Sequence, residues 1–267
     1  MLKNLLKYEM QATSRIFGGL YLALILSSVM LLVSFRIRSS WSDMPVQVMI
    51  FIYVAFAIAI VVVTIVTIIQ RFAKNLLGGE GYLMFTLPVS ESQLIASKVI
   101  SAILWCICDV VVGSLSFVLV TFMSKESLSV WGEIFNALRT HTELIGWMLM
   151  LALIVLATAA HSILKMYASC MIGHQFKRHM VGVSIIAYFI FGSIESLVGN
   201  VLSIGLNILR NELESFHLGS YFVAGIYMTL AEVSVISMLL TLAYSLVLGT
   251  IYFALTERLM HKRLNLE

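Results

Sequence analysis

Two carboxylates stand alone in long apolar stretches of this sequence. Asp109 is the only charged residue between positions 99 and 123, and Glu195 is the only one between 181 and 205. An ionised carboxylate at the centre of a membrane helix costs about 2.5 to 3.5 kcal/mol on insertion scales, so each side chain is expected to face a bundle interior or a water-filled path. Carboxylates in that position can line a translocation route or exchange protons.

Two more ionisable residues, His161 and Lys165, lie one helical turn apart in another apolar stretch. Lys165 is expected to extend to the interface, and a histidine in this setting is most often a hydrogen-bonded packing residue. Two interpretations stay open. In the first, Asp109, His161 and Glu195 line a translocation path. In the second, the acids pair with His161, Lys165 or backbone groups and hold the bundle together, aided by a row of small residues beside Glu195: Gly192, Ser196, Gly199 and Ser203.

The residue patterns do not indicate a catalytic, nucleotide-binding or metal site. The chain contains no G-x-x-x-x-G-K-[ST], H-E-x-x-H or G-x-S-x-G motif, so it is not expected to be an enzyme or to hydrolyse ATP alone. The three cysteines form no C-x-x-C pair, and the two histidines beside Lys177-Arg178 have no acid or thiolate at ligand spacing. These patterns predict no catalytic, cofactor or metal site at Cys106, Cys108, Cys170, His174 or His179.

The composition excludes a water-soluble globule. Hydrophobic residues make up 60% of the 267 positions and charged residues 12%, against about 45–50% and 25% in soluble domains. The formal net charge of +3 is too small to indicate nucleic-acid binding. The chain is therefore expected to be an integral membrane protein, with the lipid bilayer among its partners.

Six apolar runs are long enough to cross a bilayer as helices, and helices satisfy every backbone amide in hydrocarbon. The sequence therefore predicts an all-α, polytopic protein with six transmembrane helices in one domain over 1–267. The runs cover about 17–35, 46–70, 99–123, 144–170, 181–205 and 233–255.

The distribution of charge predicts the topology. If the N-terminus is cytoplasmic, most of the 17 Lys and Arg residues fall on the inner side, which places both termini in the cytoplasm. Leu2, Leu5, Leu6 and Met10 share one helical face within the first sixteen residues, which predicts an interfacial helix, although Glu9 falls on that apolar face. A basic tail that only sets the orientation is the alternative.

The outer connection before the sixth run contains an apolar segment at 221–231 that is too short to cross. It is interpreted as an interfacial or re-entrant segment, with a surface cap as the alternative.

The inner connection at 71–98 is the most structured loop of the sequence. Its glycines allow a helix to stop, and the Ser90 hydroxyl can cap a helix that begins near Glu91, with Gln93 completing a Ser-x-x-Gln box. Between these points runs an apolar patch, 82–87, which either contacts another protein or tucks against helix ends and headgroups.

The loop residues resemble the cytoplasmic loop of ABC-2-type transporter permeases from Gram-positive bacteria. The match includes Arg71, Asn75, Leu94-Ile95 and Ser97-Lys98. At its centre are Gly79, Glu80, Gly81, Tyr82, Leu83, Met84, Phe85, Thr86, Leu87, Pro88, Val89 and Ser90. The resemblance implies that 79–90 is a coupling element that docks on a separate ATP-binding subunit, and that two permeases and two ATPases form the transporter. It also implies short re-entrant helices before the sixth span.

The function expected from these observations is the permease subunit of an ABC transporter in the bacterial cell membrane. It would export a peptide, drug or lipid-like substrate as a homodimer or with a second permease. Two alternatives remain: a gradient-driven secondary transporter that uses Asp109 and Glu195, and a membrane scaffold or sensor that uses the loop to hold a cytosolic protein. The scarcity of proline argues against the broken helices of many secondary transporters.

Overall fold

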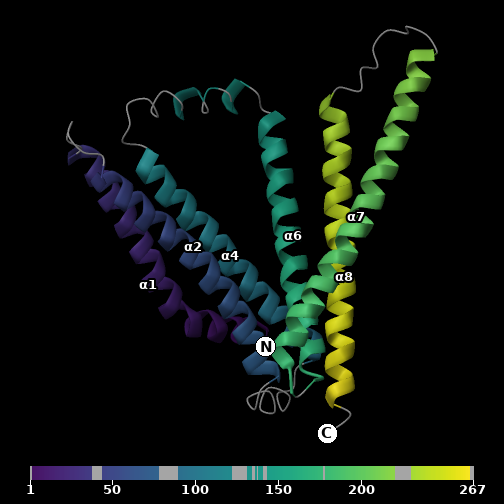
Figure 1. The fold of residues 1–267 in the computed structure, drawn as a ribbon, viewed down its shortest axis with the longest axis horizontal. Coiled ribbons are helices and arrows are strands. Elements are labelled where there is room, and N and C mark those ends of the chain that lie inside the picture. The colour runs from purple at the N-terminus through teal and green to yellow at the C-terminus, as the bar shows by residue number, and fades with distance from the viewer. Residues whose placement is uncertain are drawn as a thin grey trace. The chain divides into compact units, whose positions relative to one another are not determined.

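A computed structural model describes residues 2–37, 44–77, 90–121, 131–133, 136, 138–140, 143–176, 178–219 and 230–264. Within these ranges the chain forms long helices (Figure 1). They are α1 (Leu2–Ile37), α2 (Met44–Phe72), the π-helical turn η1 (Ala73–Leu77), α4 (Glu91–Thr121), α6 (Glu143–Gly173), α7 (Met180–Gly219) and α8 (Leu230–Leu264).

The all-helical membrane architecture expected from hydropathy is confirmed for the described residues. Six helices are long and apolar enough to cross a membrane, one for each predicted run. Most observed helix ends lie beyond the predicted runs because hydropathy marks only the apolar part of a helix. The cytoplasmic location of the termini stays a prediction.

The predicted interfacial helix and the first predicted span belong to one continuous helix, α1. Figure 1 shows that α1 changes direction in its N-terminal part. In this part Thr13 donates a hydrogen bond to the Glu9 carbonyl at 2.8 Å, and Ser14 donates one to the Gln11 carbonyl at 2.9 Å. Such bonds from a hydroxyl to the preceding turn often bend helices. The interfacial position of this part stays a prediction.

The predicted start of the third transmembrane helix is confirmed. Helix α4 begins at Glu91, and the amide of Gln93 donates to the Ser90 hydroxyl at 3.4 Å and to the Ser90 carbonyl at 3.0 Å. Ser90 therefore satisfies an amide that the helix leaves without an intrahelical acceptor.

A tight turn joins α6 to α7 and depends on Gly173. A Cβ atom at this position would lie 2.5 Å from the Met180 carbonyl oxygen and 1.8 Å from the Ser184 hydroxyl. Only glycine permits this approach of the two backbones. The amide of Val183 bonds the His179 carbonyl at 3.0 Å and starts α7.

The chain divides into two compact units, Met1–Ile163 and Leu164–Glu267, with α6 crossing the boundary. In the first unit α1, α2 and α4 pack on one another. Many large apolar side chains of both units are exposed, as expected for helices that face lipid. The single domain expected over 1–267 stays a prediction.

Candidate functional site

The carboxylate of Asp109 joins the three packed helices of the first unit. Its Oδ1 accepts a hydrogen bond from the Tyr21 hydroxyl of α1 at 2.6 Å, and its Oδ2 accepts one from the Thr64 hydroxyl of α2 at 2.7 Å. No cation among the described residues forms an ion pair with Asp109. We call Asp109, Tyr21 and Thr64 the hydroxyl network.

Aromatic side chains and a second polar contact continue the hydroxyl network along α4. Trp105, one turn before Asp109, stacks on Phe17 of α1 with ring centroids 4.1 Å apart and planes 17° from parallel. Two turns beyond Asp109, the Ser116 hydroxyl lies 3.0 Å from the Tyr53 hydroxyl of α2. Apolar stacking and paired hydroxyls therefore connect α4 to its neighbours on both sides of the acid.

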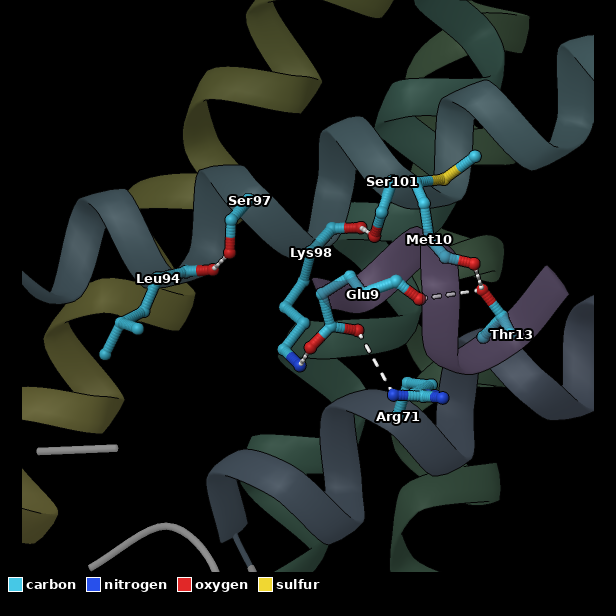
Figure 2. A network of polar contacts seen from close by, with 8 residues as sticks. All are labelled: Glu9, Met10, Thr13, Arg71, Leu94, Ser97, Lys98 and Ser101. Carbon is cyan, nitrogen blue, oxygen red and sulfur yellow. Dashed lines mark hydrogen bonds and ion pairs between the residues drawn. The ribbon is translucent and has the colours of Figure 1, made fainter. Parts of the chain in front are cut away.

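A further polar contact of the first unit joins the helix ends that flank the predicted coupling loop. The Lys98 ammonium of α4 donates to Oε1 of Glu9 in α1, and Nη1 of Arg71 in α2 lies 3.5 Å from Oε2 of the same carboxylate (Figure 2). Lys98 is 2% exposed and Glu9 8%. We call Glu9, Arg71 and Lys98 the clamp.

The hydroxyls around the clamp bond to their own helices. Ser97 donates to the Leu94 carbonyl at 2.8 Å, and Ser101 donates to the Lys98 carbonyl at 2.9 Å, as Figure 2 shows. These serines thereby satisfy their hydroxyls locally. The charged groups of the clamp face one another instead.

The second unit carries its own network around Glu195 of α7. The Lys165 ammonium of α6 donates to Oε2 at 2.7 Å, and the Tyr252 hydroxyl of α8 donates to Oε1 at 2.6 Å. The Tyr244 hydroxyl donates to the backbone carbonyl of Glu195 at 2.8 Å. One glutamate therefore links three helices, and we call Glu195, Lys165, Tyr244 and Tyr252 the ion-pair network.

The expected extension of Lys165 to the interface is wrong. The residue is 9% exposed, its ammonium lies 4.9 Å from the centre of the Tyr188 ring, and it pairs with Glu195. A buried ammonium is costly unless it is paired with an opposite charge, and the face of an aromatic ring stabilises it further. Phe191 packs edge-on against Tyr252, which bonds the same carboxylate, with ring centroids 5.2 Å apart.

The predicted site residues do not form one site but belong to separate contacts. Glu195 pairs with Lys165, one of the partners that the packing interpretation named, whereas Asp109 bonds two hydroxyls instead of His161 or Lys165. His161 is buried at 8% exposure in α6. Hydrogen bonds from neighbouring helices contact both acids, and their role in a translocation path stays a prediction.

The predicted coupling element lies mostly outside the described residues, which include Ser90 but not Gly79 to Val89. The outer segment 221–231 is likewise outside them as far as position 229. Among the described residues, no group of three or more His, Cys, Asp and Glu side chains could hold a metal ion. Cys106, Cys108 and Cys170 are free thiols.

Each network also contains residues that were not among the predicted site residues. Tyr21, Thr64, Tyr244 and Tyr252 are hydroxyl-bearing residues within apolar runs, and their signal is their type alone. Glu9 did carry a signal, because an acid on an apolar helix face requires a partner.

No family model matches this chain, and no curated protein or solved structure matches it. The resemblance to ABC-2 permeases therefore rests on the sequence and stays a prediction.

Proposed function

We propose that this chain is the membrane-spanning permease subunit of an ATP-binding cassette transporter. The observation that carries the proposal is the position of the clamp. Arg71 and Lys98, two of the residues on which the resemblance rests, flank the loop and hold one carboxylate of α1. A partner that moves this loop would therefore act on three helices of the first unit.

The loop itself suits a docking element of modest size. It would place the aromatic anchors Tyr82 and Phe85 in a groove of a separate ATPase, with the single acid Glu80 beside them. ATP binding by the partner would displace the loop and shift the helices between two arrangements, which requires the partner to bind them with different affinity. The chain lacks a phosphate-binding motif, so the partner supplies the hydrolysis.

The proposed substrate is a peptide, a drug or a lipid-like molecule that is exported across the bacterial cell membrane. Only Asp109, Lys165 and Glu195 are charged within the six apolar runs, and an apolar interior suits an apolar or amphipathic substrate. A second permease, identical or similar, would complete the pathway. Asp109, His161 and Glu195 are the candidates for polar contacts along it.

One observation favours a gradient-driven transporter as the second candidate. Asp109 is bound by neutral hydroxyls and by no cation among the described residues, so the described contacts leave its negative charge without a counter-charge. A carboxylate in such a site can exchange a proton. This candidate predicts transport that a protonophore abolishes and that ATP does not affect.

Purification from native membranes tests the main proposal. An ATPase of the ABC type is expected to accompany the chain, and Tyr82→Ala with Phe85→Ala is expected to remove it. Phe51→Ala is the matched control, because Phe51 is an aromatic residue of α2 that is 77% exposed and far from the loop in sequence.

The purified complex in vesicles is then expected to move substrate only with ATP. Recovery of the chain without any ATPase would overturn the proposal. An ATPase that accompanies the chain but drives no transport would favour the scaffold interpretation.

A further inference from the structure

The clamp joins three segments that are far apart in the sequence. Glu9 lies in the first turns of α1, Arg71 near the end of α2, and Lys98 about two turns into α4. Figure 2 shows Glu9 between the other two side chains, with one carboxylate oxygen towards each. A single carboxylate therefore links both helices that border the loop.

Burial distinguishes the clamp from an ordinary surface ion pair. Exposed pairs contribute little because water and salt screen them. Lys98 is 2% exposed and Glu9 is 8% exposed, so neither charge has ready access to solvent. Loss of the Glu9 carboxylate would remove the ionic link that Arg71 and Lys98 share, so the ends of α2 and α4 would be held less firmly.

Both helix ends have further features that define their geometry. Helix α2 closes with the π-helical turn η1, within which Leu76 is 3% exposed. Helix α4 starts at the Ser90 cap, and Leu94 and Ile95 in its first turns are 1% and 0% exposed. The loop is thus bordered by two well-packed ends, and the clamp links them through α1.

We propose that Glu9 is a positioning residue for the loop: it holds the ends of α2 and α4 in the arrangement in which the loop binds the partner ATPase. The inference rests on the proposed function. A segment whose ends are already in place loses less conformational freedom when it binds, so its affinity is higher. Glu9 then determines partner affinity without touching the partner.

The test measures the affinity of the purified ATPase subunit for the full chain in lipid nanodiscs. Glu9→Gln keeps the size of the side chain and removes its charge, and it is expected to weaken binding by about tenfold. Glu9→Asp keeps the charge and is expected to retain most of the affinity. Tyr53→Phe is the control, because it removes a contact between the same two helices, α2 and α4, at a site distant from the loop.

The outcomes separate the two proposals. If the unmodified chain binds no ATPase, the proposed function fails and the inference fails with it. If the unmodified chain binds and Glu9→Gln binds equally well, only the inference is overturned. A loss of affinity that is as large for Tyr53→Phe also overturns it, because general loosening of the bundle would then explain both.

A second variant keeps the test decisive if Glu9→Gln does not fold. Glu9→Gln combined with Lys98→Gln leaves no unpaired buried charge at the Glu9–Lys98 contact, and it also lacks the ionic link. It is expected to fold and to bind the ATPase about tenfold more weakly. Unchanged affinity in this variant would overturn the inference.

Discussion

The two units stabilise a carboxylate within a membrane span by different means. In the first unit Asp109 accepts hydrogen bonds from two hydroxyls, those of Tyr21 and Thr64. In the second unit Glu195 pairs with the ammonium of Lys165 and also accepts a tyrosine hydroxyl. An acid in an apolar run therefore does not reveal by its type whether it is paired with a charge.

The positions of the cations differ as well. The first unit places Lys98 and Arg71 with Glu9 at the helix ends, about three turns along α4 from Asp109. The second unit places its cation directly on the acid of the span. The ion pairs of the first unit are thus separate from its mid-span acid, whereas in the second unit the mid-span acid is itself in the ion pair. We therefore expect substitutions in the two units to lower the free energy of unfolding by different amounts.

The largest effect is expected at the ion-pair network. Lys165→Met leaves the half-buried Glu195 carboxylate without this cation, which should lower the free energy of unfolding by about 3 kcal/mol. The measurement is an unfolding titration with SDS in mixed micelles. Combining Lys165→Met with Glu195→Gln removes both charges and should restore most of the loss. Equal losses in the single and double variants would contradict a dominant ion pair.

The clamp should give the next largest effect. Glu9→Gln should lower the free energy of unfolding by about 2 kcal/mol, less than Lys165→Met, because Lys98 is two turns from the start of α4 and its long side chain can move towards the headgroups. The same titration measures it. If Glu9→Gln lowers the free energy of unfolding as much as Lys165→Met does, the predicted difference between a helix end and a span is wrong.

The hydroxyl network should be less sensitive. Asp109→Asn should cost about 1 kcal/mol, because the amide oxygen still accepts a hydrogen bond and membrane hydrogen bonds average about 0.6 kcal/mol. If Asp109 lines the translocation path, substrate uptake into vesicles should nevertheless fall by about tenfold, which corresponds to 1.4 kcal/mol in the barrier. Normal uptake in a stable Asp109→Asn variant would assign this acid to packing.

The helices themselves could be predicted from the sequence because hydrocarbon restricts the backbone to few options. Each of the six apolar runs corresponds to an observed helix, and the start of α4 followed from the capping chemistry of Ser90. Helix limits were less predictable. Polar turns extend some helices beyond their apolar runs, as Asn211, Glu212 and Glu214 do in α7, and hydropathy does not detect them.

The pairing of side chains could be predicted only in part. That Glu195 needs a polar partner followed from its position, and Lys165 was among those named. The tyrosine partners depend on the rotation of each helix about its axis and on its depth relative to its neighbours, which packing decides. Lys98 was placed in the inner connection at 71–98, although it lies in α4 and is buried against Glu9.

The smallest expected effect allows the most direct comparison of the two networks, because the same group, a phenol hydroxyl, can be removed from each. Tyr21→Phe and Tyr252→Phe each delete one phenol hydroxyl that donates to a carboxylate at 2.6 Å. Membrane hydrogen bonds average about 0.6 kcal/mol, so both losses should be near that value. The loss should be larger for Tyr21→Phe, because Lys165 still neutralises Glu195 whereas Asp109 keeps only Thr64 among its described partners. A larger loss for Tyr252→Phe in the SDS titration would contradict the view that Asp109 depends on hydroxyls alone.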